Sequence, residues 1–169
     1  MSIVAVETAE NPASETGLRI RLLEERDTGV VRDIIKQHHQ TTVFRDQAFS
    51  DWKLNEHFHQ ILSRPPRMVC PVAILDGKPV GVTWAVADSF MLTDGPLFVM
   101  VHVVAVDLTL PPLRRAKVFL SLVAAIRQWA NSLNATHSFI HVTTGSNIEA
   151  TDRLMKAAGA KFVGGAYLV

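Results

Sequence analysis

The densest group of charged side chains that could do chemistry lies in the run 111–117, PPLRRAK. Its cations, Arg114, Arg115 and Lys117, stand at the start of an amphipathic helical pattern that continues to residue 130. The first N–H groups of a helix have no partner within the helix and lie at the positive end of its dipole, so they favour an anion. A strand, a basic turn and a helix in this order form a phosphate-binding layout. The competing interpretation is a solvated helix face, where arginines are common.

The strand before this turn is predicted over residues 98–106, and one histidine interrupts it. The other residues are apolar and mostly β-branched, a pattern typical of a strand buried on both faces. The interrupting residue is His102, and an imidazole with its usual pKa of about 6.5 can accept a proton near neutral pH. The alternative is a core histidine that donates to a backbone carbonyl.

The remaining histidines and the one cysteine offer weaker chemistry. His57 and His59 are two residues apart, so on a helix they face different ways and make a poor metal pair. The adjacent pair at 38–39 is no better, and we predict no metal site. Cys70 lies in an apolar run and is expected to be a core residue rather than a nucleophile.

Composition narrows the class of protein. The chain has 169 residues, 48% of them apolar, which suits one domain with a sizeable core. Its 17 basic and 16 acidic residues give a net charge of +1, which argues against a nucleic-acid-binding surface. A single cysteine excludes an internal disulfide, and no apolar run approaches the roughly 18 residues that span a bilayer. We expect a cytoplasmic protein, or one of the host cytoplasm or the virion if it is viral, with no nucleic-acid or membrane partner.

Hydrophobic periodicity and turn residues predict the elements that must position these side chains. After an N-terminal tail over 1–17, strands are expected over 18–22, 68–75, 79–88, 98–106, 138–143 and 162–169. Helices are expected over 28–39, 50–63, 112–130 and 147–158. The expected anchors of the second helix are Trp52, Phe58, Ile61 and Leu62. The order β-α-α-β-β-β-α-β-α-β implies the α/β class, with a mixed sheet covered by helices in one domain over 18–169.

This order, together with the segment 140–162, resembles the GNAT superfamily of N-acetyltransferases. In that segment, IHVTTGSNIEATDRLMKAAGAKF, a strand ends before Asn147, and the helix that follows closes at Gly159 ahead of the aromatic Phe162. The run 111–122 is similar to the family's pyrophosphate loop, with Arg114 in the place of its leading basic residue. The resemblance covers 18–169 and implies the fold of this superfamily.

The resemblance also implies a reaction, direct acetyl transfer from acetyl-CoA as co-substrate to an amine of a small molecule or peptide. His102 lies about where the family often places a carboxylate base, and it would take the proton of the amine. The backbone N–H groups of Val104 and Val106 would polarise the thioester carbonyl where this strand splays from residues 139–142.

The coenzyme would be held by the basic turn. Arg114, Arg115 and Lys117 would pair with its phosphates, and Asn147 would touch the pantetheine arm or simply cap its helix. The aromatic residues that would line an acceptor pocket, unless they belong to the core, are Trp52, Trp84 and Phe90. The carboxylates that would attract a cationic amine, unless they serve turns and caps, are Asp46, Asp51, Asp88 and Asp94.

Two features depart from the family pattern. The loop positions that hold small residues in the family are occupied by Arg115, Lys117 and Phe119, whose side chains crowd the backbone approach that glycine permits. Met155 occupies the position that often carries a tyrosine general acid, and a thioether has no proton to donate. Both favour an alternative, a non-catalytic GNAT-like scaffold that serves as a structural or interaction subunit, for example of a virus or phage.

The predicted last strand is apolar and would leave an exposed sheet edge. Because such edges pair readily with other chains, we expect a protein partner, a second copy of the chain or the N-terminal tail to cover it.

Overall fold

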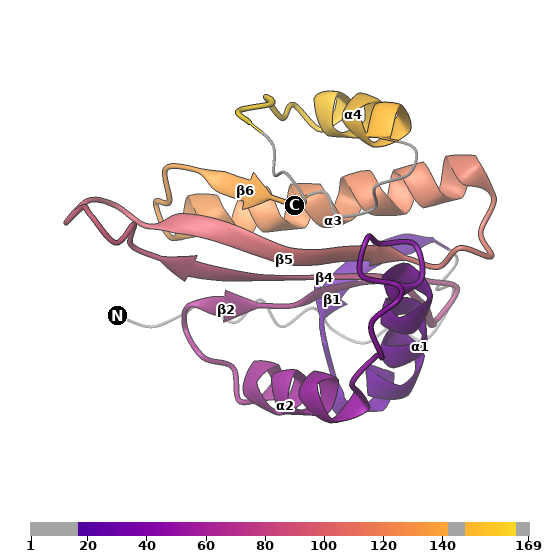
Figure 1. Cartoon of the computed structure of the whole chain (residues 1–169). Coiled ribbons are helices and arrows are strands. Elements are labelled where there is room, and N and C mark those ends of the chain that lie inside the picture. Colours follow the sequence, from indigo (N-terminus) through magenta and orange to yellow (C-terminus); the bar gives the residue numbers. More distant parts are fainter. Residues whose placement is uncertain (1–16, 142–147, 165–169) are drawn as a thin grey trace.

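A computed structural model describes residues 17–141 and 148–164, and its centre is a mixed sheet in the order β1-β3-β4-β5-β6, with β2 on β4 (Figure 1). The pairs are antiparallel except β5 and β6, which are parallel. The strands are β1 (Leu18–Leu22), β2 (Met68–Val69), β3 (Pro71–Leu75), β4 (Lys78–Asp88), β5 (Phe98–Val106) and β6 (Ser138–Ile140). The helices are η1 (Glu25–Asp27, 3-10), α1 (Thr28–His39), α2 (Asp51–Leu62), α3 (Pro112–Ser132) and α4 (Ile148–Ala157).

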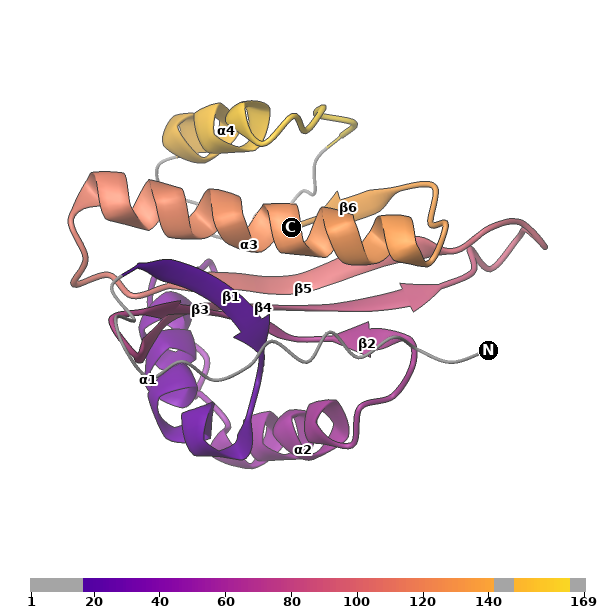
Figure 2. The ribbon, with the colours of Figure 1, turned by 180° about the vertical axis from the view of Figure 1, so that it is seen from behind.

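Helices cover both faces of the sheet. Figures 1 and 2 show α1 and α2 on one face, α3 on the other, and α4 beyond α3. The core under α1 and α2 includes Val31, Phe58 and Val82, and the core under α3 includes Ala85 and Ile126. No helix in the described ranges is long and apolar enough to cross a membrane.

A partly buried ion pair joins β1 to the residue before α1. Arg21 of β1 donates to both carboxylate oxygens of Asp27, at 2.5 and 2.8 Å, and the N–H of Glu24 donates to the same carboxylate at 2.9 Å. Burial alone would raise the pKa of Asp27, but these hydrogen bonds and the charges of Arg21 and Arg26 lower it overall. The carboxylate is therefore ionised at neutral pH and joins the first strand to the first helix.

The second helix follows its predicted limits, but one predicted anchor is wrong. Ser50 caps α2 by accepting a hydrogen bond from the N–H of Lys53, and Leu54, Phe58 and Ile61 are buried. Trp52 is 69% exposed. It lies on the other side of the helix because its position does not belong to the i, i+4, i+7 series of the buried residues.

Other differences concern strands. The predicted strand 68–75 is two strands, interrupted at Cys70, whose carbonyl accepts a hydrogen bond from the N–H of Leu23. Residues 162–164 of the predicted last strand are not in a strand, and residues 165–169 lie outside the described part. The predicted end of α4 is confirmed, with Gly159 at a φ of +78° just beyond it.

One glycine sets the distance between α3 and the sheet. A Cβ at Gly81 of β4 would lie 2.7 Å from Cγ1 of Val118 and 3.2 Å from the carbonyl oxygen of Ala105. Because no side chain fits there, the first turns of α3 approach β4 and β5 closely. This contact places the basic turn against the end of β5.

Candidate active site

A β-bulge interrupts β5 at His102. Trp84 of β4 pairs with Val103, and the next residue, Ala85, pairs with Val101, so His102 is an extra residue without its own partner. The side chains confirm this, because Val101 packs in the core under α3 whereas Val103 packs in the core under α1 and α2. In a regular strand the two would share a face. The predicted burial on both faces holds for the strand but not for His102, which is exposed.

Beyond the bulge, one edge of β5, the open edge, pairs with no residue of the described ranges 17–141 and 148–164. Pairing with β6 covers only Val99, Met100 and Val101 of β5. The N–H of Asp107 donates to the carbonyl of Val80 in β4, 2.9 Å away. Because backbone groups alternate in direction along a strand, those of residues 104 and 106 point away from β4.

The two N–H groups predicted to polarise a carbonyl, those of Val104 and Val106, therefore lie on this open edge. No described residue of β6 pairs with them. Two successive donors on one strand edge, next to a bulge that bends the strand, make a site that can bind a carbonyl or an extended polar chain.

The first turn of α3 supplies further free donors. Pro111 precedes the helix, and its carbonyl accepts the N–H of Arg115 at 3.0 Å. The N–H groups of Leu113 and Arg114 form no hydrogen bond with any described residue. This turn thus presents unpaired N–H groups at the positive end of a helix of 21 residues.

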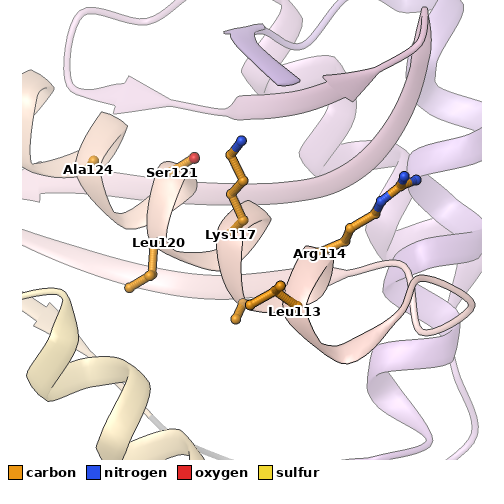
Figure 3. A pocket seen from close by; sticks show the side chains of 7 residues that line it. Leu113, Arg114, Lys117, Leu120, Ser121 and Ala124 are labelled. Atoms are coloured by element: carbon orange, nitrogen blue, oxygen red, sulfur yellow. The ribbon is translucent and has the colours of Figure 1, made fainter. Parts of the chain in front are cut away.

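Two of the three predicted cations line an open cavity of about 600 Å³ that runs along α3 from Leu113 to Ala124. Arg114 and Lys117 extend together from one side of α3, whereas Leu120 points to the opposite side (Figure 3). Arg115 is half-buried and does not line the cavity. None of the three makes an ion pair within residues 17–141 and 148–164. The other lining residues are Leu113, Ala116, Leu120, Ser121 and Ala124, which are apolar except for the serine.

His102 lies on the α2 face of the sheet among other rings. The centroid of Trp84 is 6.4 Å from that of His102 and 5.3 Å from that of His57 in α2. Although the residue is exposed overall, partial desolvation of its ring, then the nearby His57 and His141, lowers the pKa of His102 below its usual 6.5. The imidazole is therefore neutral at pH 7 and can accept a proton.

Several other predicted residues make contacts away from this site or are exposed in connections. Asp51 pairs with Lys36 at 2.8 Å, and Asp88 accepts the N–H of Ser89 at 2.8 Å. Asp46, Phe90 and Asp94 are exposed in connections between elements. Burial raises the pKa of the Cys70 thiol to about 12, which removes it as a nucleophile at neutral pH.

Two residues named from the resemblance fall at the fourth helix. Asn147 lies outside the described residues, and Met155 is half-buried in α4. No group of three or more His, Cys, Asp or Glu side chains in the described part of the chain is arranged to hold a metal ion.

The sequence did not reveal the bulge or the ring cluster. Residues 98–106 are apolar on either side of His102. A bulge moves the residues that follow it to the other face of the sheet, but the hydrophobic pattern is the same with or without that change. The spacing of the histidines relates His57 only to His59, whereas its ring neighbour is Trp84, 27 residues along the chain. The one available signal was the polar His102 inside an apolar strand.

Comparison with known proteins supports the fold alone. No protein-family model and no curated protein matches the sequence. Among solved structures, the aminoglycoside N-acetyltransferase AAC(6')-Iy with a CoA-containing bisubstrate analogue superposes with a TM-score of 0.67 at 15% identity, covering 91% of this chain and 97% of that one. Glucosamine-6-phosphate N-acetyltransferase from Arabidopsis thaliana superposes with a TM-score of 0.65 at 16% sequence identity. The match covers 90% of this chain and 97% of that one.

A transcriptional regulator from Bacillus halodurans C-125 is equally similar, with a TM-score of 0.68 at 12% identity over 90% of this chain and 99% of that one. Structures with different biological roles thus share this architecture, and fold does not decide function. The mixed sheet, the parallel β5–β6 pair and the placement of the helices nevertheless agree with the acetyltransferases over nine-tenths of the chain. The chain has the GNAT fold.

Proposed function

We propose that this protein is an acetyl-CoA-dependent N-acetyltransferase that acts on an amine. The observation that carries the proposal is the open edge of β5, where the N–H groups of Val104 and Val106 point away from β4 beyond the last pair with β6. Arg114 and Lys117 make no ion pair with any described residue, and the first N–H groups of α3 find no acceptor among them, which supports the binding of a diphosphate.

In the proposed reaction, the N–H groups of Val104 and Val106 donate to the thioester oxygen and stabilise the negative charge that develops on it. Neutral His102 accepts a proton from the amine, whose nitrogen forms a bond to the acetyl carbon. The carbon–sulfur bond then breaks, and the thiolate takes up one proton. An amide and a free thiol are the products, and the proton lost by the amine balances the proton gained by the sulfur.

The bulge gives His102 its place in this scheme. Without the extra residue, the strand would present its side chains in strict alternation, and the histidine would be paired opposite β4. With it, the imidazole stands on the exposed α2 face beside the strand whose outer edge binds the carbonyl.

Calorimetric titration with acetyl-CoA tests the proposal. We expect micromolar binding that weakens at least about tenfold in Arg114→Ala/Lys117→Ala, because two charge-assisted contacts are lost. The control, Arg45→Ala/Lys53→Ala, removes the same charge from the exposed α1–α2 connection and α2, and it should bind as the wild type does. Arg115→Ala should have a smaller effect than the double variant, since this residue does not line the cavity.

Thiol release with an amine acceptor tests the chemistry in the same preparations. His102→Gln should lower kcat about 100-fold and leave the affinity for acetyl-CoA unchanged. Absence of heat and of any thermal shift with millimolar acetyl-CoA would contradict the proposal.

That negative result would instead favour the non-catalytic scaffold. The observations for this second function are Arg115, Lys117 and Phe119 at positions where the family has small residues, and Met155 in place of a general acid. A partner at the end of the chain stays a prediction. Phe162 and Val163, at the start of the predicted last strand, are 75% and 74% exposed, and light scattering would show whether a second copy covers them.

A further inference from the structure

Three rings from three different elements form a continuous aromatic surface beside the proposed base. His57 of α2, Trp84 of β4 and His102 of β5 follow one another, with centroids 5.3 and 6.4 Å apart and interplanar angles of 38° and 37°. Both imidazoles are exposed, whereas Trp84 is partly buried against the core under α1 and α2. The tryptophan thus anchors a set of rings whose outer members are open to a ligand.

The same surface continues towards the end of β6 with groups that carry no negative charge. His141 approaches Met100 of β5, with 3.0 Å between Nε2 and Sδ. The groups that influence His102 electrostatically are His57 and His141, and no carboxylate is among them. On the neighbouring elements, Asp51 is paired with Lys36, and Asp88 lies 3.9 Å from Arg67.

A site of this kind selects against polycations. Several ammonium groups brought next to His102 would lose hydration, and no carboxylate is among the groups that influence this imidazole to compensate for the loss. Any protonated imidazole nearby would repel them. A flat aromatic ring gains contact area with the imidazoles and with Trp84, and it also gains edge-to-face or offset ring interactions.

We propose that His57, Trp84 and His102 form the acceptor subsite and that the acceptor is a monoamine carried on an aromatic ring. The inference rests on the proposed acetyl transfer at His102 and names the class of amine that this site takes. The acceptor ring packs on His57 and the edge of Trp84, and its amino group reaches His102. This class differs from the aminoglycosides bound by two of the similar structures, a neamine derivative and sisomicin.

Three amines that differ in aromaticity and in charge test the subsite, with the release of the coenzyme A thiol as the measure of acetyl transfer. 2-Phenylethylamine carries an aromatic ring, 2-cyclohexylethylamine has the same length and charge without aromaticity, and spermidine is a polycation. We expect the aromatic amine to have a KM about fivefold below that of the cyclohexyl compound, and spermidine to be the poorest acceptor. Trp84→Leu should raise the KM for the aromatic amine about tenfold with little change in kcat, and Trp84→Phe should restore most of the loss.

Direct binding separates this inference from the proposed reaction. Calorimetry measures the binding of 2-phenylethylamine to the wild type, to Trp84→Leu and to His57→Ala, a substitution of an exposed residue. Each titration is done with and without CoA. Thermal melts first show that each variant is folded. Binding that depends on Trp84 and His57 supports the subsite even if acetyl-CoA does not bind and the proposed reaction fails. Acetyl transfer to spermidine in preference to 2-phenylethylamine, or aryl amine binding that neither substitution weakens, overturns the subsite while the proposed reaction stands. Failure of 2-phenylethylamine to bind or react at all also overturns it.

Discussion

A single extra residue, His102, distinguishes β5 from a plain buried strand. The bulge turns Val103 and Ala105 toward α1 and α2 and leaves Val99 and Val101 facing α3. His102 lies between the last residue of one pairing register with β4 and the first residue of the next, and it is exposed beside Trp84. One local irregularity therefore frees the imidazole from the core and reverses the faces of the residues that follow it.

The ring neighbours of His102 should be visible in its titration. We expect its pKa, followed by NMR of the imidazole protons, to lie below 6.5 in the wild type, because burial and the nearby His57 and His141 disfavour the charged form. His57→Gln removes one of the two neighbours that lower the pKa of His102, so this pKa should move upward. His59→Gln, an exposed α2 residue without a ring contact to Trp84, is the matched control and should leave it unchanged. If the pKa of His102 is the same in His57→Gln as in the wild type, this account of the ring cluster is refuted.

At the scale of elements, the contact between α3 and the sheet decides where the basic turn lies. Gly81 lets Val118 and Leu122 pack directly over β4, next to the carbonyl of Ala105 in β5. The amphipathic pattern of residues 112–130 predicted this helix and its buried stripe, because the 3.6-residue period is explicit in the sequence. The close approach was not predicted, since a glycine within a strand pattern does not say which neighbour needs the space.

Replacement of this glycine should therefore be costly. Gly81→Ala places a methyl group 2.7 Å from Val118 Cγ1, and we expect the free energy of unfolding in urea to fall by about 1–3 kcal/mol. The matched control is Gly29→Ala, where a Cβ meets nothing within 4 Å and the helical position favours alanine by about 0.5–1 kcal/mol. Equal effects of the two substitutions would show that α3 does not pack on β4 in this way.

At the scale of the whole molecule, the order of elements was predictable and their irregularities were not. Apolar periodicity, Asp76-Gly77 and the cap at Ser50 locate strands and helices because each acts within a few residues. The bulge at His102 and the ring contact between His57 and Trp84 depend on residues far apart in sequence. Of the predicted site, Val104 and Val106 share the open edge and Arg114 and Lys117 share the cavity, while Arg115 stands apart.

Acid should destabilise the molecule in a defined range of pH. Burial lowers the pKa of both His38 and His102, with contributions from neighbouring histidines, so the unfolded chain binds more protons than the native one below about pH 6.5. Stability is therefore full above this pH and falls as the pH drops through the lowered pKa values. Urea titrations from about pH 7.5 to about pH 5 measure the slope, which should be shallower in His38→Gln than in His59→Gln. A stability that rises on acidification across this range would contradict these assignments.

The central claim is that acetyl-CoA binds along the open edge of β5 and at the start of α3, and amide NMR tests it most directly. In a titration of the labelled protein with acetyl-CoA, we expect the amide signals of Val104, Val106 and Arg114 to shift most, because their N–H groups are the free donors of the site. The signals of Val72 and Ile74, which are buried in β3, should stay in place. If the three donors stay unshifted at saturating acetyl-CoA, or if the shifts gather on another surface, the proposed coenzyme site is contradicted.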